Sequence, residues 1–304
     1  MKWRGRKRSS NIEDRRGQRG GGFGGSGGTG PRLRMPRGRS AGPGGAGGLA
    51  LVVIIVVVSV ALGVDPMQFL SGGGTPGSSE PQSQRSAAPA ANDDLTQFVG
   101  VVIQETEDLW GDVFAQNGLV YDPPTVILYS ERTSAAGCGV ANASTGPFYC
   151  PADQNIYIDL TFYETLRARF GAPGDFAQAY VLAHEVGHHV QQLTGVLPEF
   201  NAARPRLSRE EANQWSVRVE LQADCYAGVW ANYAGQEDLL ERGDIEEALN
   251  AASQIGDDTL QKNMQGFAVP KTFTHGTSEQ RKRWFERGFA QGRVDQCDTF
   301  EGAI

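Results

Sequence analysis

Residues 175–195, DFAQAYVLAHEVGHHVQQLTG, decide the fold of this chain. The stretch contains no proline and is largely apolar, which predicts a long helix buried inside a domain. Gly195 stands where a glycine commonly ends a helix. Histidine and glutamate side chains on a buried helix need polar partners, so residues 184–189 (HEVGHH) are expected to contact other groups inside the domain.

Three of the four histidines of the chain lie in this helix. His184 and His188 are four positions apart, so their imidazoles lie on one helix face and can converge on a single ion. Zinc accepts nitrogen ligands, and a catalytic zinc site leaves one position for water. Glu185 can take a proton from that water. The pattern predicts a zinc site with Glu185 as general base, whereas His189, about 100° away around the helix, is expected not to be a ligand.

A third ligand is predicted on a second helix, over about residues 209–233, which opens with the capping box Ser208–Glu211. Glu220 and Asp224 are four positions apart on one face of this helix, and their neighbours are apolar. Two carboxylates on a buried face need a compensating cation. We therefore predict Glu220 as the third zinc ligand and Asp224 as the acceptor of a hydrogen bond from a ligand imidazole. The alternative is an exposed acidic face.

His275 is the remaining histidine and precedes a capping box at residues 277–280. A histidine in this loop could donate to the oxyanion of a tetrahedral intermediate, with Arg281 or Arg283 assisting. An exposed loop histidine without a chemical role is an equal alternative.

The first 92 residues have a different composition. Residues 1–40 contain twelve Lys or Arg and two acidic residues, a charge of +10, so the remainder carries −17. We expect residues 1–45 to form a disordered, Gly- and Arg-rich tail and residues 67–92 a flexible linker. Residues 46–64 carry no charge and are long enough to cross a bilayer. Residues 46–66 are predicted as a single transmembrane helix; a cleaved signal peptide or a buried core segment are the alternatives.

Charge then predicts topology. Basic residues gather before the span, which places the N-terminus in the cytoplasm and residues 93–304 outside the cytoplasmic membrane. Membrane lipid is therefore an expected partner through residues 46–66. Nucleic acid is not expected as a partner, because topology already explains the basic tail; a cytosolic nucleic-acid-binding protein is the alternative.

The four cysteines Cys138, Cys150, Cys225 and Cys297 support an exported domain. An even number of cysteines outside the cytoplasm predicts two disulfides, for which three pairings are possible. A Cys138–Cys150 bond would close a short loop, and Cys225–Cys297 would then tie the second helix to the C-terminus. No Cys-x-x-Cys pair is present to suggest cysteine ligation of zinc.

The rest of the domain is predicted as mostly helical with a small sheet. Apolar periodicity and caps predict helices over residues 94–116, 161–169 and 277–291, and another that opens with a capping box at residues 244–247. Strands are predicted at residues 125–129 and 155–160, which are rich in Ile, Val and Tyr.

Several blocks carry a family resemblance: GCG (137–139), FYCPADQNIYIDL (148–160), AYVLAHEVGHHVQ (179–191), ELQADCYAGVWA (220–231), AASQIGDDTLQ (251–261), THGTSEQRKRWFERGF (274–289) and CDTF (297–300). With them the chain resembles the bacterial predicted neutral zinc metallopeptidases, single-span membrane proteins with an exported catalytic domain, and more widely the gluzincins. The resemblance implies an α+β zincin-like domain over residues 93–304, with zinc on His184, His188 and Glu220, Glu185 as general base, Asp224 in support, and a peptide or protein substrate.

The predicted reaction is hydrolysis of a peptide bond by a zinc-activated water. A catalytically inactive zinc-bound module that binds envelope proteins is the rival. The intact Glu185 argues against that rival, because a purely structural zinc site has no use for a base at this position.

Overall fold

The computed structural model describes residues 1–17 and 93–304. A four-stranded sheet has the order β1-β2-β6-β5, in which β1, β2 and β6 are parallel and β5 is an antiparallel edge strand. A separate hairpin pairs β3 with β4. The strands are β1 (Ile12–Asp14), β2 (Thr125–Tyr129), β3 (Arg132–Ala135), β4 (Gly139–Asn142), β5 (Phe148–Cys150) and β6 (Asn155–Asp159).

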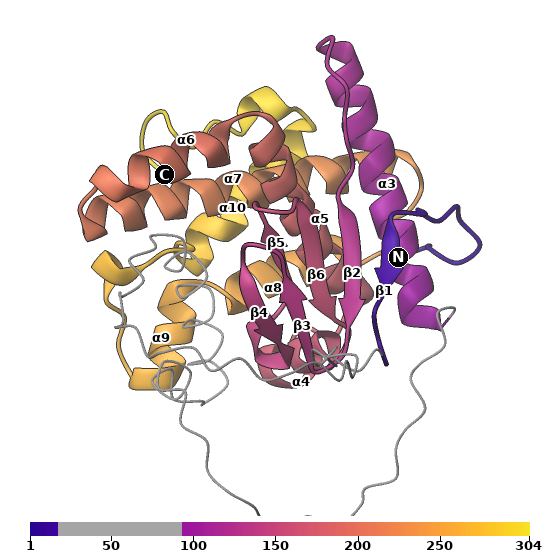
Figure 1. Cartoon of the computed structure of the whole chain (residues 1–304), viewed down its shortest axis with the longest axis horizontal. Helices are drawn as coiled ribbons and strands as arrows, with labels where there is room; N and C mark the ends of the chain where they lie inside the picture. Colours follow the sequence, from indigo (N-terminus) through magenta and orange to yellow (C-terminus); the bar gives the residue numbers. More distant parts are fainter. Residues whose placement is uncertain (18–92) are drawn as a thin grey trace, which may run out of the picture.

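Helices make up most of the domain and pack on one face of the sheet, whereas the β3–β4 hairpin packs on the other (Figure 1). They are α3 (Asp94–Gln116), α4 (Phe162–Phe170), α5 (Asp175–Leu193), α6 (Val196–Ala203), α7 (Arg209–Gln236), α8 (Asp244–Gln254), α9 (Asp257–Gln265) and α10 (Ser278–Gln291). The prediction of a mainly helical α+β domain with a small sheet is thus confirmed for the described residues. The capping boxes at Ser208 and Thr277 are present, but Gly243, not Asp244, caps α8.

The predicted central helix is α5, and it packs against α3, α7 and α8. Thr194 caps its C-terminus, and Gly195 follows with a φ of 90°. The neighbouring helices α7 and α10 approach backbone to backbone through two glycines. A Cβ on Gly228 would lie 2.1 Å from the Phe285 carbonyl oxygen, and one on Gly288 would lie 2.0 Å from that of Cys225. This close approach brings the start of α10 next to the acidic residues of α7.

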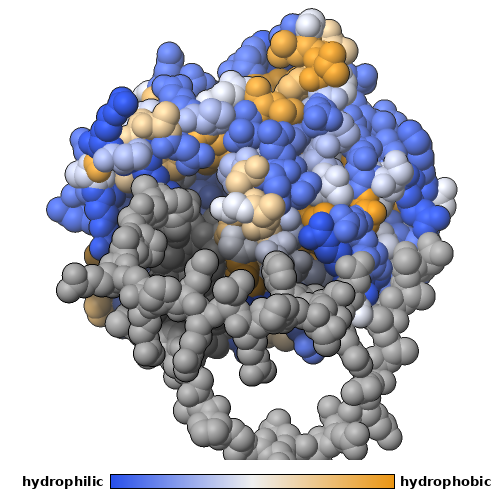
Figure 2. All heavy atoms as spheres, in the orientation of Figure 1, coloured by the Kyte–Doolittle hydropathy of each residue, from blue (hydrophilic) through white to orange (hydrophobic). Residues whose placement is uncertain are grey.

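Two disulfides hold the domain. Cys138–Cys150 joins the β3–β4 hairpin region to the edge strand β5, and Cys225–Cys297 joins α7 to the C-terminal segment. The prediction of two disulfides is therefore confirmed, and the pairing left open by the sequence is settled. Apolar side chains are largely internal, although Figure 2 shows apolar surface at the outer end of α3, where the exposed Leu119 and Val120 follow the helix.

Residues 1–17 belong to the folded domain, so the prediction of a disordered tail is wrong for this part of residues 1–45. Ile12–Asp14 adds the strand β1 to the sheet beside β2, and the side chain of Met1 is buried. The Met1 amino group lies 2.8 Å from Asp175 Oδ1 at the start of α5. Composition misled the prediction because it averages this segment with the glycine-rich sequence that follows it.

The basic residues of this segment pair with acidic residues of the body. Two ion pairs join Lys2 to Asp238 and Arg4 to Asp94. Two more join Arg6 to Glu105 and Arg16 to Asp93. The basic residues of segment 1–17 therefore pair with acidic residues of 93–304 inside one domain. These basic residues help to hold the domain together, a role other than setting membrane topology.

The packing of residues 1–17 also bears on the membrane topology, which stays a prediction. Arg16 Nη1 lies 2.7 Å from Asp93 Oδ2, so the two ends of the intervening stretch are in contact. One crossing of the stretch would separate these ends by a hydrocarbon layer roughly 30 Å thick. Residues 1–17 and 93–304 must therefore share one side of any membrane while they are packed together.

The predicted span at residues 46–66 and the predicted linker at residues 67–92 lie outside the described residues. Within the two described ranges, no helix combines the length and the apolarity that a membrane crossing requires.

A cross-link can test the docking of residues 1–17. Ile12 and Val126 are partners in the β1–β2 register, so the Ile12→Cys/Val126→Cys variant of the full chain should form a third disulfide when it folds in its own membrane. Thiol labelling and electrophoresis without reductant would detect the bond. The Ile12→Cys single variant is the control. Lack of the bond in a variant that retains both native disulfides would contradict the docked arrangement.

Candidate metal centre and active site

The three predicted ligands meet between α5 and α7. His184 Nε2 lies 3.2 Å from Glu220 Oε2, and His188 Nε2 lies 3.5 Å from Glu220 Oε1. One donor atom from each residue falls within 4.8 Å of the others. Gly187 lets the helices approach, because a Cβ there would lie 3.1 Å from Ala223 Cα. Two imidazole nitrogens and one carboxylate form a donor set that suits zinc and leaves a fourth position open.

Hydrogen bonds orient both imidazoles toward the shared point. His184 Nδ1 lies 2.9 Å from Asp224 Oδ1, as the sequence predicted. His188 Nδ1 lies 2.9 Å from Gln191 Oε1, and Gln191 Nε2 donates to the Val219 carbonyl of α7. With Nδ1 donating on each ring, Nε2 keeps its lone pair for a metal. The residues therefore fit a zinc ion by chemistry and by orientation.

Asp224 sits in a network that the sequence did not predict. Arg281 of α10 donates through Nε to Asp224 Oδ2 at 2.8 Å and through Nη2 to Asp224 Oδ1 at 2.9 Å. The Tyr180 hydroxyl donates to Oδ1 at 2.5 Å. Asp224 is completely buried and Arg281 is 3 % exposed. The bidentate ion pair with Arg281 fixes the Asp224 carboxylate, and that carboxylate orients the His184 ring. Arg281 therefore acts on the candidate metal centre and not on an oxyanion.

Glu185 faces the same cavity from α5, and the edge strand binds it. Its Oε2 accepts a hydrogen bond from the Tyr149 backbone N–H at 2.8 Å. The side chain is 8 % exposed, and burial raises its pKa to about 7. A carboxylate with a pKa near neutrality is suited to exchange protons with water.

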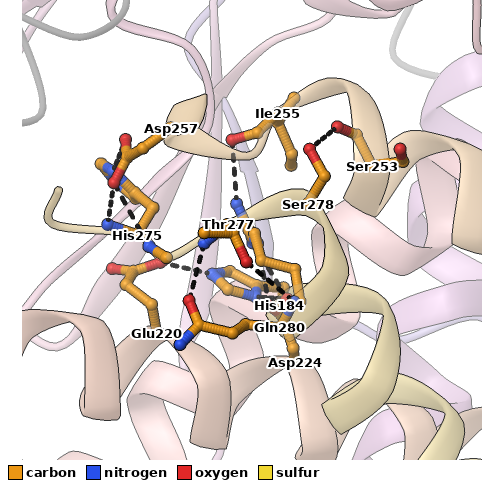
Figure 3. Close-up of polar contacts among 12 residues, drawn as sticks. His184, Glu220, Asp224, Ser253, Ile255, Asp257, His275, Thr277, Ser278 and Gln280 are labelled. Atoms are coloured by element: carbon orange, nitrogen blue, oxygen red, sulfur yellow. Dashed lines mark hydrogen bonds and ion pairs between the residues drawn. The ribbon is translucent and has the colours of Figure 1, made fainter. Parts of the chain in front are cut away.

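The cavity has a volume of about 150 Å³, and its lining combines the three candidate ligands and Glu185 with mainly apolar residues of β5, α4 and α9. His275 also lines it, next to Glu220 in Figure 3. Asp257 holds this histidine: Asp257 Oδ2 accepts the His275 backbone N–H at 2.6 Å, and Oδ1 lies 3.3 Å from its Nδ1. His275 is therefore a held cavity residue and not an exposed loop histidine.

The electrostatics of the cluster favour a bound cation. Burial lowers the pKa of His188 to about 4, so this ring is neutral. Burial also disfavours the charged form of His184, but the carboxylates of Asp224 and Glu220 outweigh it and raise its pKa to about 10. Burial alone would raise the pKa of Glu220, yet the His275, His188 and His184 rings lower it well below its usual value. Within the donor set His184 is therefore the ring that carries an extra proton here, and a bound metal ion would take the place of that proton.

His189 lies away from the three candidate ligands, as predicted. Its Nε2 lies 2.7 Å from the Asp122 carbonyl oxygen and its Nδ1 3.1 Å from the Tyr149 hydroxyl. A second group of acids within the described residues could also approach a cation, at Asp175, Asp244 and Glu247. There the Met1 amino group already supplies the positive charge.

The sequence matches the family described as Putative neutral zinc metallopeptidase over residues 1–300, a range that includes the docked segment 1–17. It is 46% identical over 304 residues to the uncharacterized protein YpfJ of Escherichia coli K12, covering all of both chains. It is 44% identical over 194 residues to the uncharacterized proteins Mb2605 of Mycobacterium bovis and Rv2575 of Mycobacterium tuberculosis, covering 60% of this chain and 64% of each relative. No solved structure matches. The chain therefore belongs to the putative neutral zinc metallopeptidase family.

Proposed function

We propose that this protein is a zinc-dependent peptidase in which His184, His188 and Glu220 hold the metal and Glu185 is the general base. The observation that carries the proposal is the meeting of these four side chains, from two helices, at one buried cavity. Bound zinc would supply a Lewis acid that polarises the scissile carbonyl and acidifies a water molecule. Family membership supports the same chemistry.

Side chains of the protein supply proton transfer and the stabilisation of the oxyanion. Glu185 accepts the proton of the attacking water and passes it to the leaving amine. His275 is held at Nδ1 by Asp257, and neighbouring Glu220 and Asp257 outweigh burial and raise its pKa, so its charged form is favoured. Its Nε2–H is thus available to stabilise the oxyanion of a tetrahedral intermediate.

The substrate of the proposed enzyme is an extended peptide that lies along β5. This strand is an edge of the sheet, and Pro147, Phe148 and Tyr149 line the cavity. An extended peptide can add to such an edge through main-chain hydrogen bonds. The Tyr149 N–H already binds Glu185, and Pro147 has no N–H. Peptide N–H groups that donate to β5 carbonyls therefore carry the recognition.

We also propose that the domain works outside the cytoplasmic membrane and that residues 46–66 attach the protein to lipid. Two disulfides support an oxidising compartment. Residues 1–17 belong on the same side as the domain, because their ion pairs and β1 join it. This placement replaces the cytoplasmic N-terminus that charge alone predicted.

Metal removal tests the proposed function. The purified full-length protein should contain one zinc per chain, degrade an unfolded protein, lose that activity with a chelator and regain it with added zinc. His188→Ala should lose most of the zinc, because only two ligands remain. Metal analysis and a fluorescent casein assay would measure these effects. Zinc bound by the wild-type protein without any hydrolysis would favour the inactive envelope-binding module instead.

A further inference from the structure

Tyr149 of the edge strand is held twice by α5. Its backbone N–H donates to Glu185 Oε2 at 2.8 Å, and its hydroxyl lies 3.1 Å from His189 Nδ1. Glu185 and His189 are four positions apart, so they occupy one face of α5 one turn from each other. His189, which follows the candidate ligand His188, is thus connected to the general base Glu185 through Tyr149 of β5.

The surroundings of His189 fix its tautomer. Nε2 lies 2.7 Å from the Asp122 carbonyl oxygen, which can only accept, so Nε2 carries the proton and Nδ1 accepts from the Tyr149 hydroxyl. His189 is 1 % exposed. The ring therefore works as a fixed bridge between the loop at Asp122 and the side chain of Tyr149.

The strand that carries this N–H needs such a support. β5 has three residues and pairs with β6 on one side only. Its other side faces the cavity, where Glu185 binds it. The disulfide from Cys150 to Cys138 anchors the end of the strand, but a short edge strand that pairs on one side still moves more readily than a central strand. A displaced Tyr149 would release the Glu185 carboxylate from its orientation.

We propose that His189 is a positioning residue that acts through Tyr149 to hold the β5 edge, and with it Glu185, in the working geometry. The inference rests on the proposed peptidase function. It gives the third histidine of residues 184–189 a role other than metal binding: it fixes the base and the strand on which the substrate lies.

His189→Phe and Tyr149→Phe test this role, because each keeps an aromatic ring and removes the hydroxyl–imidazole bond. Each should lower kcat/KM by about 10- to 100-fold, because kcat falls as Glu185 loses its orientation and KM rises as the substrate-binding strand loosens. Zinc content should stay at the wild-type value. The kcat of the double variant should equal that of the more impaired single variant, because both changes break the same contact.

A matched control removes a hydroxyl from the same place. The ring of Tyr121 packs edge-on against His189, and within the described residues its buried hydroxyl has no hydrogen-bond partner. Tyr121→Phe should therefore leave kcat at the wild-type value. Equal losses in Tyr121→Phe and Tyr149→Phe would assign the effect to general packing and overturn the positioning role.

Amide hydrogen exchange separates this inference from the proposed function, because it does not depend on activity. The amide of residue 149 should exchange at least about tenfold faster in both test variants than in the wild-type protein and Tyr121→Phe. Unchanged exchange would overturn the positioning role even if the protein is a peptidase. Faster exchange in a protein that hydrolyses nothing would leave the structural link in place and reject the enzyme.

Discussion

Glutamine in place of Glu185 is expected to lower the kcat of peptide hydrolysis by about 10²- to 10⁴-fold, the usual contribution of a general base. Glutamine has nearly the same shape and can still accept the Tyr149 N–H at its amide oxygen. It cannot take a proton from water. Zinc content and substrate affinity should stay close to the wild-type values, because the candidate ligands His184, His188 and Glu220 are unchanged. Zinc analysis and steady-state kinetics would measure both.

Glu199→Gln is the matched control for this substitution. Glu199 is exposed on α6 and is absent from the cavity lining, so the control should retain full activity. Full activity in Glu185→Gln would reject Glu185 as the base and leave the metal centre without its proposed reaction.

Replacement of Arg281 with methionine should have the largest effect on stability. Arg281 makes two hydrogen bonds to a carboxylate that is completely buried. Removal of one partner from a buried ion pair typically costs about 3–5 kcal/mol, because the other charge stays buried without compensation. The Asp224 carboxylate would keep only Tyr180 and His184. Denaturant unfolding of zinc-free protein would give the loss of free energy of unfolding.

Arg283→Met is the control, since Arg283 is exposed on the same helix and its replacement should change stability by less than about 0.5 kcal/mol. Equal effects of the two substitutions would contradict the network around Asp224.

The network should also make the stability of the protein depend on pH. Burial alone would raise the pKa of Asp224, but Arg281 and His184 lower it from 3.8 to about 2. The depressed pKa means that the ionised carboxylate stabilises the fold above pH 3.8, and this contribution is lost as the pH falls toward 2.

The chemistry of the candidate site was readable from the sequence because helices impose short-range geometry. Spacing of four placed His184 beside His188 and Glu220 beside Asp224, and the apolar neighbours of both pairs indicated burial. The contacts that the sequence missed join residues that are far apart in the chain, such as Arg281, which was predicted to assist at an oxyanion and instead binds Asp224. Arg281 lies 57 positions from Asp224, and no local pattern links them. The Tyr149 contact with Glu185 uses a backbone N–H, which leaves no signature in residue types.

The docked segment escaped prediction for a different reason. Its strand is three residues long, too short for a periodic signal, and its charges resemble those of a disordered tail. The available signal was electrostatic complementarity: residues 1–40, which include the docked segment, carry +10, and the rest of the chain carries −17. We interpreted that contrast as topology, whereas part of it forms ion pairs inside the domain.

The place of β1 in the sheet has a consequence for synthesis. Ile12 leaves the ribosome more than a hundred residues before its partner Val126, and Lys2 more than two hundred before Asp238. The segment must therefore wait unpaired while its binding surface is made. Closing so long a loop is slow but costs little additional entropy, since that cost grows only with the logarithm of length. We expect β1 to join last, as the step that completes a domain already built around α5.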